Sequence, residues 1–105
     1  MKNIIDHLQK GGDGVFQVNE MTEPLMLTYN ILRWAVRDQA DILIVHPDRV
    51  AWYKGNSQVG EFHPHVFVLG FTRILEQIII RDHLVKNMLR LVSKEPDKTT
   101  YEMIY

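Results

Sequence analysis

The sequence predicts a small α+β domain in which one sheet packs against helices on one of its faces. Two patterns and the chain length support this class. Short runs rich in branched apolar residues, such as ILIV at 42–45, alternate with longer segments whose apolar residues recur every three or four positions. The chain has 105 residues, 46% of them hydrophobic and 24% charged, which fits one compact domain and leaves no room for a second. We therefore interpret residues 1–105 as a single domain.

The first third of the chain predicts helix, strand and helix. Apolar residues on one face indicate a short helix over 2–10, which the glycines of GGDG at 11–14 end, and VFQV at 15–18 is typical of a short strand. A second helix is expected from Thr22, a good N-cap, to about Gln39. Its apolar stripe consists of Leu25, Tyr29, Leu32 and Val36.

Two continuous apolar runs predict the strongest strands. The run 42–45 has no polar residue and is typical of a strand buried on both faces, so we expect it at the centre of the sheet. Residues 62–69 form the second such run, and the polar stretch 55–60 before it is expected to be a loop.

The segment between these runs has two interpretations. Val50–Tyr53 can be a further strand, or Asp48 can cap one or two helical turns that Gly55 ends, and we favour the short helix. The fourteen residues 40–53, ADILIVHPDRVAWY, resemble the strand, Pro-Asp turn and short helix in the peripheral region of tailed-phage capsid subunits. We infer no function from this resemblance.

A long C-terminal helix is expected to start at Thr72. About 22 helical residues would span ~33 Å, roughly the width of a domain of this size. Two apolar stripes run along it, the main one broken around Arg81-Asp82. Together they exceed what one small sheet can cover, so we predict a homodimer that associates through this helix. Pro96 lies just beyond its end, and TYEMIY at 100–105 is expected to form a last strand.

Composition narrows the compartment and the partners. The absence of cysteine excludes disulfide frameworks, thiolate metal sites and cysteine nucleophiles, and fits a reducing compartment. No apolar run approaches the ~20 residues of a membrane span, so we expect a soluble cytoplasmic protein with no membrane partner. Twelve Lys and Arg balance thirteen Asp and Glu, which argues against general attraction to nucleic acid.

The histidines supply the most specific candidate site. In a strand, His63 and His65 would project from one face, a spacing that lets two imidazoles reach one metal ion. Antiparallel pairing of strand 42–46 with 62–69 would bring His46 and Asp48 close to them, a set that suits Zn, Fe or Mn. Alternatively, Pro64 marks the start of a strand, where solvent-facing histidines need no further role.

Two other groups are candidate contact surfaces. Trp52 and Tyr53 are large aromatic residues near the polar loop, and with His63 and His65 they form the surface that we expect to contact a ligand or partner. One flank of the predicted long helix is basic and is a weaker candidate for nucleic-acid contact. Its residues are His83, Lys86, Arg90 and Lys94.

The function favoured by these patterns is that of a small cytoplasmic, non-catalytic binding or regulatory protein that contacts a protein or a small ligand, without a cofactor. The main alternative is a histidine-based metalloprotein, in the form of a metal-dependent hydrolase. Nucleic-acid contact through the basic flank comes third.

Overall fold

The computed structural model describes residues 23–63 and 71–104. These residues form an α+β domain with a five-stranded antiparallel sheet, so the predicted fold class is confirmed. The predicted helix 2–10, the GGDG turn and the strand 15–18 lie outside the described residues. No helix within the described ranges has the length and apolar character needed to cross a membrane.

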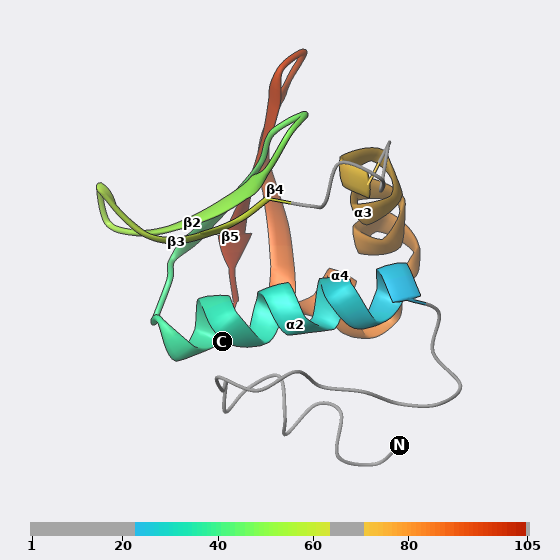
Figure 1. Cartoon of the computed structure of the whole chain (residues 1–105), viewed down its shortest axis with the longest axis horizontal. Coiled ribbons are helices and arrows are strands. Elements are labelled where there is room, and N and C mark those ends of the chain that lie inside the picture. The colour runs from blue at the N-terminus through green and yellow to red at the C-terminus, as the bar shows by residue number, and fades with distance from the viewer. Residues whose placement is uncertain (1–22, 64–70, 105) are drawn as a thin grey trace.

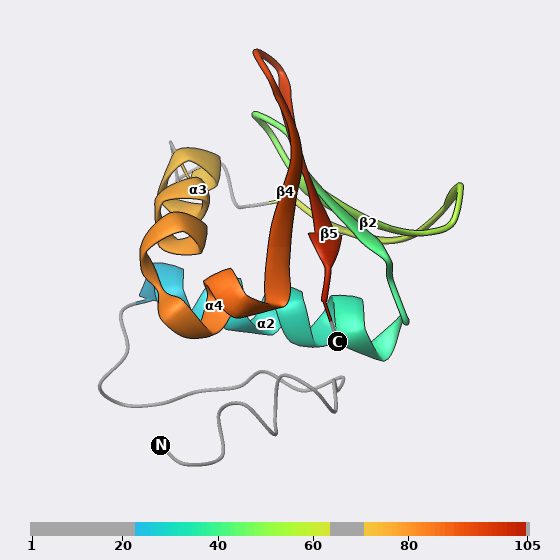
Figure 2. The ribbon, with the colours of Figure 1, turned by 180° about the vertical axis from the view of Figure 1, so that it is seen from behind.

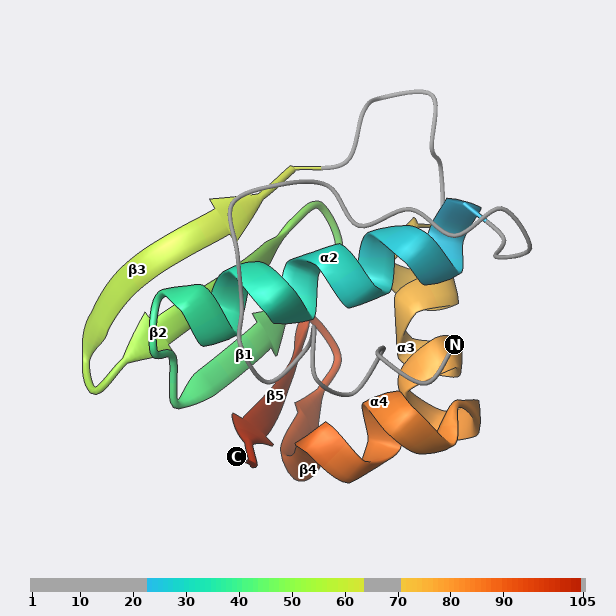
Figure 3. The same ribbon diagram turned by 90° about the horizontal axis from the view of Figure 1, so that it is seen from below.

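Helix α2, Glu23–Arg37, lies across one face of the sheet (Figure 3). It ends in a Schellman motif, in which the amide of Ala40 donates to the Ala35 carbonyl and that of Gln39 to the Val36 carbonyl, both at 2.9 Å. Gln39 has a φ of 58°, the left-handed conformation that this motif requires. The predicted C-terminus near Gln39 is therefore confirmed.

Strands β1 (Ile42–Val45) and β2 (Val50–Lys54) form a hairpin, so the short helix that we favoured for this segment is wrong. Pro47 and Asp48 occupy a tight turn, closed by the amide of His46 donating to the Arg49 carbonyl at 2.8 Å. Proline presets φ at such a turn, and the Val, Trp and Tyr that follow have high strand propensity.

Strand β3, Ser57–Phe62, occupies most of the stretch expected to be a loop. Gly55 begins the two-residue turn between β2 and β3 with a φ of 61°, which fits a type II′ hairpin. Gly60 lies directly against the indole of Trp52, where a Cβ atom would overlap the ring. Of the predicted strand 62–69, Phe62 ends β3 and residues 64–70 are outside the described residues.

The predicted long C-terminal helix is wrong, because the chain changes direction twice within it. Helix α3, Phe71–Arg81, ends before Asp82, which begins the short helix α4, His83–Met88. The chain then enters strand β4, Leu89–Glu95, and returns through β5, Lys98–Met103. Figure 2 shows α4 leading directly into β4.

The strands lie in the order β3-β2-β1-β5-β4, which places β1 at the centre as predicted. Helices α3 and α4 pack, together with α2, against one face of the sheet, near β5 and β4 (Figure 1). The core forms between α2, α3, α4 and the face of the sheet that carries Leu43, Val45 and Tyr101. Tyr101 and Met103 are buried on the same side of β5, as the alternation in TYEMIY predicts.

Candidate functional site

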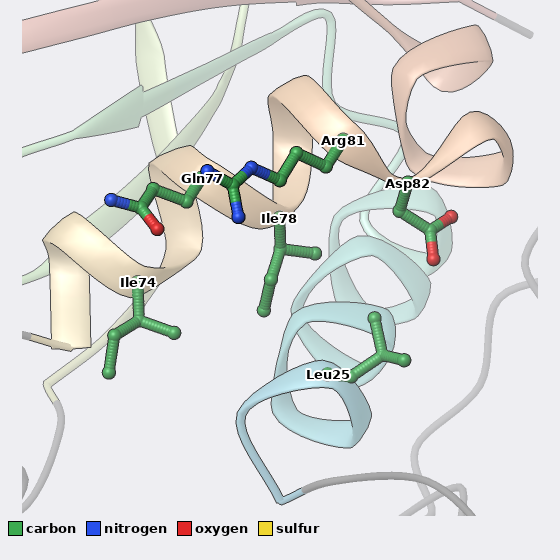
Figure 4. Close-up of a pocket in the computed structure, with 6 residues that line it drawn as sticks. All are labelled: Leu25, Ile74, Gln77, Ile78, Arg81 and Asp82. Atoms are coloured by element: carbon green, nitrogen blue, oxygen red, sulfur yellow. The ribbon is translucent and has the colours of Figure 1, made fainter.

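A pocket lies between the start of α2 and the outer side of α3 (Figure 4). Its volume is about 340 Å³, at the lower end of the range usual for small-ligand sites. The six described residues that line it are Leu25, Ile74, Gln77, Ile78, Arg81 and Asp82.

Three aliphatic side chains form the apolar surface of this pocket. Ile74 and Ile78 are one helical turn apart on α3, and Leu25 faces them from α2. Ile74 is 38% exposed, a large fraction for an isoleucine at the junction of two helices. A ligand that covers these side chains would therefore remove apolar surface from water.

The polar groups of the pocket differ in whether they already have partners. In Figure 4 the Arg81 side chain extends along α3 toward the amide of Gln77. Within the described ranges, the Arg81 guanidinium has no hydrogen-bond or ion-pair partner, so its five donors remain available to a ligand.

Both carboxylate oxygens of Asp82, by contrast, already accept hydrogen bonds from the protein. Its Oδ1 accepts from the amides of Leu84 at 2.9 Å and Val85 at 3.1 Å, which caps α4, and its Oδ2 accepts from the Tyr29 hydroxyl at 3.0 Å. This carboxylate therefore joins the start of α4 to the middle of α2.

The raised pKa of Tyr29 makes the stability of the fold depend on pH in the alkaline range. Burial raises the pKa of Tyr29 well above its ordinary value, and the hydrogen bond to Asp82 and the charge of that carboxylate add to the effect. Burial likewise raises the pKa of Tyr101 to about 12. The unfolded tyrosines lose their protons near pH ~10, before the folded ones do, so stability is retained below that pH and lost as the pH rises above it.

Tyr29→Phe should therefore reduce the alkaline loss of stability. We expect the wild-type melting temperature to fall more steeply than that of the variant between about pH 9 and pH 11. Circular dichroism melts across this range test the prediction, with Tyr53→Phe as the control, because among the described residues that hydroxyl bonds only the side chain of Gln58, at the surface. Parallel curves for wild type and Tyr29→Phe would contradict it.

The predicted histidine site is not assembled as expected within the described residues. Strand β1 pairs with β2 and β5, so β2 lies between β1 and the strand that ends beside His63. The required pairing of 42–46 with 62–69 is wrong, because both edges of β1 are already occupied. His65 lies outside the described residues, and residues 23–63 and 71–104 contain no group of three or more His, Cys, Asp or Glu that could hold a metal ion.

The remaining residues of that set have separate surroundings. His46 has a buried Nε2 with no hydrogen-bond partner in the described part of the chain. Its burial, together with the positive charge of the nearby Arg49, lowers its pKa. Asp48 is exposed and pairs with Arg49 at 3.2 Å. His63 is exposed, with its Nε2 3.4 Å from the Glu61 carboxylate. A metal site that includes His65 remains a prediction.

The two aromatic candidates differ in exposure. Trp52 is only 2% exposed, and its indole N–H donates to Asp38 at 2.8 Å, so it ties β2 to the end of α2. The hydrogen bond from Arg37 is the largest cause that holds the pKa of Asp38 below its usual value. The bond from Trp52 and the charge of Arg37 add to this effect. Tyr53 is half-buried on the opposite side of β2, and its hydroxyl donates to Gln58 at 3.3 Å.

The predicted basic flank is divided between two elements. His83 and Lys86 belong to α4, whereas Arg90 and Lys94 belong to β4. Arg90 also pairs with Glu102 at 2.7 Å. The expectation of one basic helix face is therefore wrong, because the helix ends at Met88.

The α2/α3 pocket was not predicted from the sequence. Its apolar residues were assigned to core stripes of two separate helices, and the pattern does not show how those helices cross. The break at Arg81-Asp82 was the available signal, since a charged pair interrupting an apolar stripe marks an exposed position or a helix end.

No family model, curated protein or solved structure matches this chain.

Proposed function

We propose that the protein is a non-catalytic cytoplasmic binding and regulatory protein, that it works as a homodimer, and that its ligand site is the α2/α3 pocket. One observation carries the choice of site: the Arg81 guanidinium, which has no partner among residues 23–63 and 71–104, borders an exposed aliphatic surface. Ligand pockets typically combine an apolar lining with a few well-placed polar groups.

The ligand class follows from these two parts. The aliphatic surface of Leu25, Ile74 and Ile78 suits a hydrocarbon chain. The Arg81 guanidinium suits a carboxylate group, which it can bind with two parallel hydrogen bonds. Gln77 can add an amide donor beside it. We therefore assign the pocket to an apolar carboxylate.

The same residues argue for binding rather than catalysis. A general base must have a free acceptor within reach of the reacting proton, whereas both oxygens of Asp82 already accept hydrogen bonds. The Tyr29 hydroxyl stays protonated because its pKa is raised, and it already donates to that carboxylate.

Arg81→Gln should weaken the binding of octanoate, our probe for this class, by at least about tenfold, because a charge-assisted hydrogen bond contributes roughly 1.5–3 kcal/mol. Chemical-shift titration of amide resonances measures the affinity, and the shifts should centre on Ile74, Ile78 and Arg81. Octanol, which has the same chain without the charge, should bind the wild type more weakly than octanoate.

Arg73→Gln is the matched control. Arg73 is an exposed arginine on the same helix that does not line this pocket, so its loss removes one positive charge and leaves the site intact. If the two substitutions weakened octanoate binding equally, the effect would come from the change in net charge and not from a contact with Arg81. Shifts that spread over the whole surface, or equal affinity for octanoate and octanol, would refute the assigned ligand class.

A further inference from the structure

Strand β4 is an edge strand whose outer side is unoccupied among the described residues. β5 pairs with its inner side, and every residue from Arg90 to Lys98 is exposed. Leu91 is 57% exposed and Val92 54%. A seven-residue edge strand with exposed apolar side chains presents free backbone donors and acceptors to any strand that can lie beside it.

A register irregularity between Leu91 and Ser93 decides which faces the β4 side chains occupy. Before it, Arg90 pairs with Glu102 on the face of the sheet away from the helices. After it, Lys94 pairs with the buried Thr99, and Glu95 pairs with Lys98. Arg90 and Glu95 therefore share the open face although they are five positions apart, which a regular strand would not allow.

We propose that two copies of this chain associate through antiparallel pairing of their β4 strands, with a two-fold axis between Val92 and Ser93. The pairing would place Arg90 of each copy opposite Glu95 of the other, so two ion pairs would form on the open face. It would also cover Val92 and join the two sheets into one. This inference rests on the homodimer of the proposed function and gives it an interface.

Charge complementarity supports a second copy as the occupant. Within one chain, Arg90 pairs with Glu102 at 2.7 Å and Glu95 pairs with Lys98 at 3.6 Å. In the proposed dimer the charges would therefore alternate in sign across the four strands at the interface. The row consists of Glu102 and Arg90 of one copy, then Glu95 and Lys98 of the second copy. Opposite charges directly across a strand pair stabilise it, whereas like charges destabilise it.

The other edge of the sheet serves as an internal comparison. Strand β3 is also exposed over Ser57–Val59, but its exposed apolar residue is a single valine, Val59, at 38%. Its charged residue, Glu61, already lies near both Arg49 and His63. Strand β4 therefore exposes more apolar side chains than β3 does, which is why we place the interface on β4.

Sedimentation velocity over a range of protein concentrations tests the interface. The wild type should be a dimer, and Val92→Lys should raise the dimer dissociation constant at least about tenfold, because it buries two unpaired charges. Val59→Lys on the β3 edge is the matched control and should leave the constant unchanged. Circular dichroism of each variant verifies that the subunit is folded.

A charge exchange tests the register. Arg90→Glu alone and Glu95→Arg alone should each weaken the dimer, whereas the double variant should restore it, since the opposite charges again face each other between copies. The intrachain pairs with Glu102 and Lys98 are lost in the double variant, so a purely internal role predicts that it is the least stable of the three.

Each outcome has a separate meaning. A wild type that is monomeric at every concentration would overturn the homodimer and this interface together, without affecting the pocket. A dimer that is insensitive to Val92→Lys would overturn the β4 interface alone. A double variant that stays as dissociated as the single variants would overturn the proposed register.

Discussion

Leu43→Ala is expected to lower the free energy of unfolding by about 2–5 kcal/mol, because it truncates a side chain at the centre of the core. Leu43 is 1% exposed at the centre of β1, where it lies between Trp52 on β2 and Tyr101 on β5. Removing its isopropyl group leaves a cavity that strands on both sides prevent from collapsing.

Ile44→Ala is the control for this truncation. Ile44 is the next residue of the same strand, but it points to the other face and is half-buried. Ile44→Ala removes the same number of carbon atoms, but from a side chain that is already partly in water. The loss of unfolding free energy should therefore be clearly smaller than for Leu43→Ala. Urea unfolding of both variants measures the difference, and equal losses would mean that the sheet face under α2 is not the main core.

Asp82→Ala is expected to destabilise the fold by about 2–4 kcal/mol, because it removes two contributions at once. The amides of Leu84 and Val85 lose their cap, which is worth about 0.5–2 kcal/mol. The hydroxyl of Tyr29, a residue only 2% exposed, loses its acceptor at a cost of about 1–3 kcal/mol.

Asp82→Asn and Tyr29→Phe separate the two contributions. Asparagine caps a helix about as well as aspartate, so Asp82→Asn should retain most of the cap and lose the charge that Tyr29 faces. In the Tyr29→Phe background, Asp82→Ala should cost only the cap. Thermal melts of the double-mutant cycle measure the coupling, and additive effects would show that the 3.0 Å contact contributes nothing to stability.

The sequence predicts the parts of the fold that local patterns determine. The stripe of α2 predicts a helix and the continuous run of β1 predicts a central strand, and both are confirmed. The expected burial of β1 on both faces is wrong, because Ile42 and Ile44 are only half-buried. Residues 89–95 contain good helix formers, and their partner strand lies beyond a turn, so local preference gave no reason to end the helix at Met88. Pairing with β5 outweighs that preference.

Two signals in the sequence could have shown the break. Arg81-Asp82 interrupts the apolar stripe because Asp82 is an N-cap between two helices. Leu89, Arg90 and Leu91 alternate with the period of a strand, which an interpretation of two helical stripes conceals. The pocket needed more than either signal, since its two walls come from α2 and α3 and only the crossing of these helices brings Leu25 to Ile78.

The position of β1 has a consequence for the order in which the chain folds. The β1-β2, β2-β3 and β4-β5 contacts join neighbouring segments, and isolated hairpins of this kind form within about 1–10 μs. The pairing of Ile42 with Glu102 instead closes a loop that contains β2, β3, α3, α4 and β4. Closing that loop costs entropy before any contact repays it, so we expect two separately formed hairpin units whose docking along β1 and β5 sets the folding rate.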